Sequence, residues 1–308
     1  MTKRTMGSIS LLLLGLWMAP GMVLGGGVSV DARAMQSMLA FLGTQPLGTR
    51  PAVSLSPGCA LPAPTAAPGT LLVDGQLREF ILVAPRGYSP HRPHRLVFAF
   101  HGRTNSNAKA RGYFDLEDHA SAGTLFVYPG GMSNGRGAYS WFDPRDRGDA
   151  LRDYRFFDAL LAHIGERYCV DRRQVYLVAH SLGASFANSL ACARADRVRA
   201  VATLAGGVLP SRCRGSVAAM VLHNPQDRLV PVAHGLRARD HFLAQNGIDD
   251  TPVGAGPRHF NCRRYGDARN PVLWCPHNHN YSSRGRFYPH NWPRLTGKTI
   301  MDFFASLP

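Results

Sequence analysis

The residue whose surroundings say most about chemistry is Ser181. It lies in the stretch Tyr-Leu-Val-Ala-His-Ser-Leu-Gly-Ala-Ser, residues 176–185, where an apolar strand pattern meets a serine, a glycine and then a helical pattern. A sharp strand-to-helix turn of this kind raises a serine Oγ above a sheet, beside the free N–H groups that begin a helix. Ala179 replaces the first glycine of the ideal G-x-S-x-G pattern, and a helix N-cap is the alternative role for the serine. Ser181 is therefore a candidate nucleophile for acyl transfer.

A serine nucleophile needs a base, and the base needs an acid that orients it. In a strand–turn–helix architecture these residues follow the serine in the order acid, then histidine. The acid candidate is Asp227, which follows an apolar strand pattern and precedes a helical one, with turn formation as its alternative role. The base candidate is His290 in Tyr-Pro-His-Asn-Trp-Pro, where the prolines restrict the backbone. His277 and His279, in a polar loop, are competitors for the role of base.

Two backbone segments are candidates for binding the negative charge that develops on an acyl oxygen. Residues 98–104 read Phe-Ala-Phe-His-Gly-Arg-Thr, so a strand ends in His-Gly and the N–H groups of Gly102 and Arg103 can point at that oxygen. The N–H of Leu182 is the second donor expected from the turn at the serine. The alternative role for Gly102 is a simple turn. Loss of one such donor raises the barrier of a typical hydrolase by about 3–4 kcal/mol.

The elements that must position these residues alternate between apolar strands and amphipathic helices. Residues 71–83 read as an antiparallel hairpin that turns at Asp74-Gly75. The following strands are continuously apolar, which indicates burial on both faces. The pattern therefore predicts an α/β fold of the α/β-hydrolase type, a mainly parallel sheet with helices on both faces and an N-terminal antiparallel hairpin. The expected strands are 95–100, 124–128, 174–178, 201–204, 218–222 and 271–274, and the expected helices are 154–167, 184–194, 232–245 and 296–306.

The beginning of the chain has the pattern of a secretory signal peptide. Two basic residues precede an apolar stretch, so residues 1–34 are expected to be the signal, with cleavage after residue 25 or residue 34. That stretch is short and broken by proline, and no later one reaches about 18 apolar residues, so no stable membrane span is expected. Residues 35–69 are expected to be a leader and a Pro/Ala-rich linker, and residues 70–308 a single catalytic domain. The predicted localisation is extracellular or periplasmic.

Cysteine usage fits the same compartment. In an exported chain, disulfides are the default state of the six cysteines, which are Cys59, Cys169, Cys192, Cys213, Cys262 and Cys275. The pairs Cys192–Cys213 and Cys262–Cys275 would close short loops, but the connectivity remains open at this point. No C-x-x-C pair occurs, which disfavours zinc, and no metal or cofactor is expected.

The formal net charge of +15 comes almost wholly from arginine, because lysine occurs only at Lys3, Lys109 and Lys298. Such a balance raises the question of nucleic-acid binding. The arginines are spread over loops and helix faces without an aromatic-basic repeat, so a solvated basic surface is favoured and no nucleic-acid partner is expected. A basic surface could also promote adhesion to anionic cell-wall polymers.

Taken together, four motifs resemble, in order, landmarks of the polyhydroxybutyrate depolymerase and feruloyl esterase family of α/β hydrolases. Those landmarks are H-G, G-x-S-x-G, H-G-x-x-D-x-x-V-P and H-x-W-P, and here they correspond to His101-Gly102, the turn at Ser181, residues 223–231 and residues 290–293. The resemblance spans about residues 59–304. Besides Ala179, this chain departs from the family pattern at Asn224 and Pro289, which stand where glycine is usual.

The resemblance implies a secreted serine esterase that forms an acyl-enzyme through Ser181, with His290 as base and Asp227 as its partner. The family covers polyester oligomers, hydroxycinnamate esters on plant polysaccharide and simple acyl esters, and the sequence does not choose between these substrates. Contact with the substrate is expected of three residues, with packing as the alternative role: Trp141, His180 and Trp292. An acyltransferase on the same fold and a non-catalytic cell-surface binding protein remain as alternatives, and the oligomeric state is not indicated.

Overall fold

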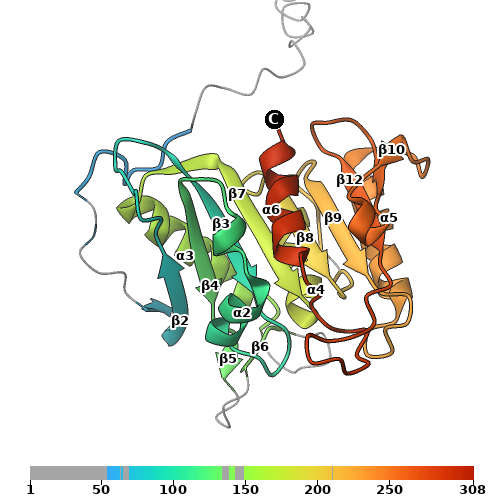
Figure 1. Cartoon of the computed structure of the whole chain (residues 1–308). Helices are drawn as coiled ribbons and strands as arrows, with labels where there is room; N and C mark the ends of the chain where they lie inside the picture. The colour runs from blue at the N-terminus through green and yellow to red at the C-terminus, as the bar shows by residue number, and fades with distance from the viewer. Residues whose placement is uncertain (1–53, 63, 65–68, 134–138, 143–148, 210) are drawn as a thin grey trace, which may run out of the picture. The chain divides into compact units, whose positions relative to one another are not determined.

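The centre of the described chain is a ten-stranded sheet whose middle strands run parallel (Figure 1). The computed structural model describes residues 54–62, 64, 69–133, 139–142, 149–209 and 211–308. The strand order is β1-β2-β4-β3-β7-β8-β9-β12-β11-β10. Pairing is parallel from β4 through β12 and antiparallel at both edges. The bounds are β1 Thr70–Val73, β2 Gln76–Val83, β3 His94–Phe100, β4 Thr124–Pro129, β7 Val170–His180, β8 Ala200–Leu204, β9 Ala218–His223, β10 Gly254–Ala255, β11 Arg263–Tyr265 and β12 Val272–Pro276.

Helices cover both faces of this sheet because its strands are apolar on both sides (Figure 1). In β3, Leu96, Phe98 and Phe100 pack with the helices of one face, while Val97 and Ala99 pack with those of the other. The first face carries α3 (Arg152–Arg167), α4 (Leu182–Ala193) and α5 (Val232–Asn246), and the second carries α2 (Asn107–Phe114) and α6 (Thr296–Ser306). Short 3₁₀ turns occupy Glu117–His119 and Arg258–Phe260, and a separate ribbon pairs β5 (Met132–Ser133) with β6 (Tyr139–Ser140). This is the α/β-hydrolase arrangement that the sequence predicts.

The elements predicted from apolar periodicity are present. The hairpin turns at Asp74 and Gly75, both with positive φ, which is why Asp-Gly suits it. Periodicity did not reveal α2, whose sequence Asn-Ala-Lys-Ala-Arg-Gly-Tyr-Phe buries only Ala110 and Phe114. It also missed β11, because only Tyr265 of its residues is buried. Short elements with a polar majority carry too weak an apolar pattern to be recognised.

Residues 54–62, part of the predicted linker, make specific contacts with the rest of the described chain. The N–H of Ser56 donates to the carbonyl of Val170, and its Oγ donates to the carbonyl of Tyr168 at 2.6 Å. Cys59 then forms a disulfide with Cys169. The Pro- and Ala-rich stretch has no apolar periodicity, so the sequence does not indicate these backbone contacts. Residues 1–53, with the predicted signal peptide and most of the predicted leader, lie outside the described residues.

Three disulfides join all six cysteines in pairs. Cys192–Cys213 and Cys262–Cys275 are the short-loop pairs anticipated from the sequence. Cys59–Cys169 connects residues 110 positions apart and attaches the N-terminal segment to the start of β7. Among the helices of the described ranges, none is long and apolar enough to cross a membrane.

Candidate active site

Ser181 occupies a sharp turn between β7 and α4. Its φ of 60° and ψ of −125° lie in a region that L-residues rarely adopt, which typically requires about 1–3 kcal/mol of support from the surroundings. The support comes from backbone contacts on both sides, because the Ser181 N–H donates to the carbonyl of Leu204 at 2.9 Å and its carbonyl accepts from Ser185. The turn is also tight, since a Cβ on Gly183 would lie 2.3 Å from the carbonyl oxygen of His101. The serine is thus held at the carboxyl edge of the parallel strands.

Ser181, His290 and Asp227 lie in one hydrogen-bonded chain. The Ser181 Oγ lies 2.8 Å from His290 Nε2, and His290 Nδ1 lies 2.6 Å from Asp227 Oδ2. With the proton on Nδ1 directed at the carboxylate, Nε2 is free to accept the serine proton. Both the imidazole and the carboxylate are buried, so little water competes for these contacts. The arrangement can therefore activate the serine hydroxyl as a nucleophile.

Asp227 is ionised and fixed by its own loop. Its Oδ1 accepts the N–H groups of Leu229 and Val230 at 2.9 and 3.0 Å. Burial alone would raise the pKa of Asp227, but the hydrogen bonds from His290 and Val230 outweigh it and hold the pKa below its ordinary value. A carboxylate that stays charged keeps the imidazole in one tautomer.

His290 is held in turn by His180, the residue before the serine. His180 Nε2 donates to the carbonyl of His290 at 3.1 Å, and its Nδ1 lies 3.3 Å from the hydroxyl of Tyr113. Burial lowers the pKa of His180 to about 3, so this ring is neutral and can both donate and accept. His180 was expected to contact substrate; in the structure it lies behind His290 and binds its backbone carbonyl. Tyr113, on the unpredicted helix α2, was not identified from the sequence.

The His-Gly loop after β3 lies against the serine. A Cβ on Gly102 would come within 3.1 Å of the Ser181 Cβ, so only glycine fits comfortably between them. The loop continues into Arg103, and Leu182 is the first residue of α4, whose N–H has no acceptor within the helix. The three residues expected to supply oxyanion donors thus all border the Ser181 turn.

Trp141 and Trp292, the two tryptophans expected to contact substrate, both pack against aromatic side chains. Trp141 is fully buried, stacks on Phe186 with 5.4 Å between ring centroids and donates from Nε1 to the carbonyl of His101 at 2.7 Å. Trp141 therefore supports the loop that carries Gly102, and its contact with substrate stays a prediction. Trp292 is partly buried against Phe114, at 4.3 Å between ring centroids.

The competing histidines are engaged elsewhere. His279 Nε2 lies 2.9 Å from the carbonyl of His259. His277 is fully buried, and burial lowers its pKa to about 3. In the structure neither ring is hydrogen-bonded to Ser181, whereas His290 is.

Asn224, one of the departures from the family pattern, connects the loop of the acid to the loop of the base. Its Nδ2 donates to the carbonyl of His279 and to Asn280 Oδ1 at 3.2 and 2.9 Å, while its Oδ1 accepts the N–H of Gln226. Asn291 Nδ2 donates to the same His279 carbonyl at 3.0 Å. A glycine at position 224 would lack all three side-chain contacts. An asparagine beside the acid was the available signal in the sequence, although its partners were not deducible from it.

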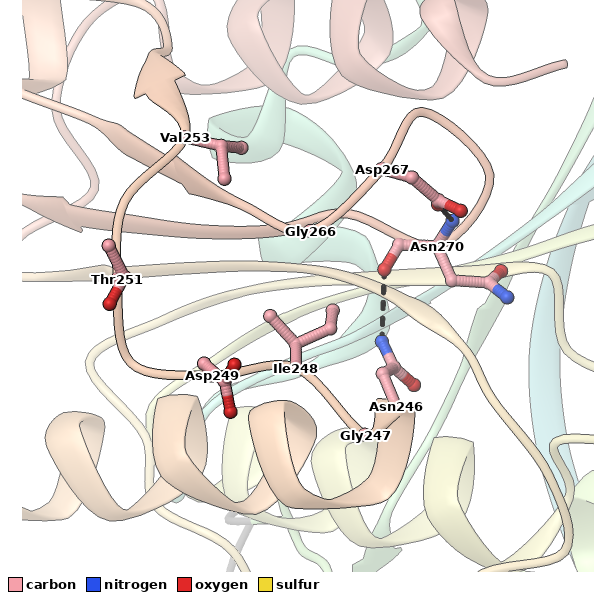
Figure 2. A pocket seen from close by; sticks show the side chains of 9 residues that line it. All are labelled: Asn246, Gly247, Ile248, Asp249, Thr251, Val253, Gly266, Asp267 and Asn270. Carbon is pink, nitrogen blue, oxygen red and sulfur yellow. Dashed lines mark hydrogen bonds between the residues drawn. The ribbon is translucent and has the colours of Figure 1, made fainter. Parts of the chain in front are cut away.

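Two further features of the described chain resemble binding sites, but their polar or sulfur atoms are already engaged. A polar pocket of about 440 Å³ lies at the C-terminal end of α5 (Figure 2). Asp227 precedes the N-terminal end of that helix, which is about 22 Å long, so the pocket lies far from Ser181, His290 and Asp227. Its polar groups bind one another, since Asn246 Nδ2 donates to the carbonyl of Asn270 and Asp267 Oδ1 accepts the Asn270 N–H. Cys192, Cys213 and His241 come within metal-binding distance, but both sulfurs are shared in a disulfide and offer no thiolate.

Two relatives in sequence and one solved structure are feruloyl or ferulic acid esterases. No protein-family model matches the chain. Feruloyl esterase C of Emericella nidulans is 31% identical over 208 residues, covering 65% of this chain and 72% of that protein. Feruloyl esterase D of Neurospora crassa is 30% identical over 258 residues, covering 76% and 85%. Among solved structures, a CE1 ferulic acid esterase from Anaeromyces mucronatus shares the fold with a TM-score of 0.51 at 13% identity, covering 76% of this chain and 87% of that one.

Proposed function

Because this chain belongs to the feruloyl esterase family, and is therefore a carboxylic ester hydrolase, we propose that it is a secreted serine esterase acting on hydroxycinnamate esters. Ser181 is the nucleophile, His290 the general base and Asp227 the partner that orients it. The observation that carries this assignment is the continuous chain of contacts, 2.8 Å from Ser181 to His290 and 2.6 Å from His290 to Asp227.

The reaction proceeds in two halves. His290 Nε2 takes the Ser181 proton as Oγ attacks the ester carbonyl, and the Asp227 carboxylate stabilises the imidazolium that forms. Backbone N–H groups at Leu182 and in the Gly102–Arg103 loop bind the oxyanion. The imidazolium then protonates the departing alcohol, and a water molecule releases the acyl group by the same steps in reverse.

Hydroxycinnamate esters are proposed as substrates because the named relatives are feruloyl esterases. Polyester oligomers and simple acyl esters are the competing substrates, because the family that the four motifs resemble also acts on them. Secretion is supported by the N-terminal signal pattern and by the three disulfides, which form and persist in oxidising compartments.

Two variants of the same residue type test the nucleophile. The chain is compared with Ser181→Ala and with Ser283→Ala, an exposed serine outside this hydrogen-bonded chain, for release of p-nitrophenol from its acetate ester. Ser181→Ala should lose at least three orders of magnitude in kcat, whereas Ser283→Ala should match the unmodified chain. Equal rates for all three proteins would overturn the assignment, and equal rates no higher than that of buffer alone would favour a non-catalytic binding protein.

The base is tested with a second matched pair. His290→Ala should reduce kcat by orders of magnitude, and His279→Ala should leave it within a few-fold, because the His279 ring binds the carbonyl of His259. The reverse ranking would assign the base to His279.

Substrate class and reaction type are separated by products. Methyl ferulate, 3-hydroxybutyrate oligomers and acetylated xylan are offered at equal ester concentration, with and without an added alcohol acceptor. The proposal expects ferulate as the preferred product and free acid as the main species. Transfer of most acyl groups to the alcohol would identify an acyltransferase, and preference for the oligomers would identify a polyester-degrading enzyme.

A further inference from the structure

A short two-stranded ribbon fixes the His-Gly loop beside Ser181. The ribbon comprises residues 130–133 and 139–142, which contain β5 and β6. It makes three hydrogen bonds to the loop. Gly131 N–H donates to His101 Nε2 at 2.9 Å, Trp141 Nε1 donates to the His101 carbonyl at 2.7 Å, and Thr104 N–H donates to the Tyr139 carbonyl at 2.8 Å. The position of the loop therefore depends on the position of the ribbon.

Both ends of this ribbon bind a buried ion pair, Arg78–Asp153, whose carboxylate also lies 3.3 Å from Nε of the partly exposed Arg152. Arg78, from β2, and Asp153, from α3, lie 2.9 Å apart with side chains 3% and 0% exposed. Arg78 Nη2 also donates to the carbonyl of Gly130 at 3.2 Å, where the ribbon begins. Asp153 Oδ2 accepts the N–H of Phe142 at 2.7 Å, where the ribbon ends. One guanidinium and one carboxylate thus hold the two ends of the ribbon together.

Stability is a weak reason for such a pair. Removing two charges from water is costly, and replacing a buried ion pair by apolar residues of similar size is often neutral or stabilising. What apolar side chains cannot do is bind the Gly130 carbonyl and the Phe142 N–H. The specific contribution of this ion pair is therefore its directional hydrogen bonds to the ribbon.

We propose that Arg78 and Asp153 are positioning residues for ester hydrolysis, which act through the ribbon and His101 to fix the backbone donors of the Gly102–Arg103 loop. Neither residue touches the serine, so they are not themselves catalytic. The inference rests on the proposed function, because the loop matters only if it binds an oxyanion opposite Ser181. A displacement of about 1 Å at such a loop is enough to reduce a rate by about 100-fold.

The test replaces the ion pair by an apolar pair and measures catalysis separately from folding. A single substitution would leave Arg78 buried without its carboxylate, or Asp153 with only the 3.3 Å contact from Arg152, so the double variant Arg78→Met/Asp153→Leu is the informative one. The matched control is Arg194→Met/Asp158→Leu, which removes a 2.7 Å pair between Arg194, the residue that follows α4, and Asp158 of α3; none of the hydrogen bonds of this pair reaches the ribbon.

Four quantities are measured for each protein: kcat, KM, affinity for a boronic acid that forms a tetrahedral adduct with the serine, and hydrogen exchange at residues 101–105. In the Arg78/Asp153 double variant we expect kcat and boronate affinity to fall by about 10- to 100-fold, KM to change less than threefold, and exchange to accelerate. The control should keep kcat and boronate affinity within twofold at matched temperature below its Tm.

Two results would overturn the inference, and they are distinguishable from failure of the proposed function. If the folded double variant keeps kcat and boronate affinity within twofold while Ser181→Ala is inactive, the esterase assignment stands and the positioning role is wrong. The positioning role is also wrong if the control pair loses as much activity as the Arg78/Asp153 pair. If Ser181→Ala itself keeps the rate, the proposed function fails first, and the positioning role fails with it.

Discussion

Substitution of Gly183 by alanine is a direct test of how closely the serine turn and the His-Gly loop must approach. Gly183 is the second residue of α4, and a Cβ there would lie 2.3 Å from the carbonyl oxygen of His101 and 2.7 Å from that of Phe100. Favourable contacts between non-bonded heavy atoms begin near about 3.5 Å, so the two backbones must separate by about 1 Å. Both are backbone atoms, so no side-chain rotation can relieve the contact.

The separation has two consequences of different size. Overpacking of this kind typically costs about 1–3 kcal/mol, and in a domain of this length each kcal/mol lowers Tm by about 2–4 °C. The chain should therefore remain folded at room temperature. The larger effect is on catalysis, because a shift of the His101 carbonyl breaks its 2.7 Å hydrogen bond from Trp141 and moves the donors of the next two residues. We expect kcat to fall by about 100-fold with KM changed only a few-fold.

The assay is hydrolysis of methyl ferulate and p-nitrophenyl acetate, with Tm measured by circular dichroism. Gly112→Ala is the matched control, because it lies in the exposed part of α2 and a Cβ there meets no atom within 4 Å. It should keep its kcat and gain about 0.5–1 kcal/mol in stability from the better helix former. If Gly183→Ala keeps more than half of the original kcat, the argument that this close approach positions the oxyanion donors is refuted.

Three further outcomes follow from contacts at the site and from the disulfides. The pKa of Asp227 lies below its ordinary value when folded, so the ionised form stabilises the protein above about pH 4 and this contribution is lost as pH falls. Asp227→Asn should therefore flatten the fall in Tm between about pH 5 and pH 2, and an unchanged profile would contradict this. Replacing both cysteines of Cys59–Cys169, which closes 110 residues, should destabilise by about 5 kcal/mol in denaturant titrations, against about 3 for Cys262–Cys275, which closes 13; the opposite ranking would argue against the entropic account. His180→Ala removes the donor to the His290 carbonyl and should lower kcat by about tenfold, with recovery in His180→Gln, whose amide can donate from a similar position; no recovery would mean that the ring acts by packing.

Much of the hydrogen-bonded chain at Ser181 could be predicted from the sequence, because its members lie at the ends of elements that the sequence reveals. Ser181, Asp227 and His290 each stand next to an element with a clear apolar period, and the order of those elements in a parallel sheet places their following loops at one edge. Leu55 and Ser56 show the opposite case. They contact β7 through single backbone pairings, which leave no apolar period in a Pro- and Ala-rich stretch, so the sequence did not reveal these contacts.

Trp141 shows where residue type alone is ambiguous. An indole next to a glycine-rich stretch suggests a substrate surface, yet the ring is fully buried and its N–H is used by a backbone carbonyl. Arg78 carried a sequence signal that did not enter the prediction. It shares with Phe80 the buried face of β2, and an arginine on an inward position is rarely found without a partner. What the alternation could not reveal is that the partner is Asp153, which lies 75 residues further along the chain.

These cases share one physical cause. A nucleophile, a base and an acid are side chains, so the residue type indicates what chemistry they can perform. An oxyanion hole consists of backbone N–H groups, which every residue except proline possesses. A sequence can mark such a site only through the glycine that lets the backbones approach, as Gly102 and Gly183 do here. Trp141, Arg78 and Asp153, which hold that backbone in place, come from other elements and bind backbone atoms. Because every residue has a backbone carbonyl, and every residue except proline a backbone N–H, such a contact does not depend on the residue type that it reaches. For this reason the support of the oxyanion donors emerges only from the folded chain, although the reacting residues are legible in the sequence.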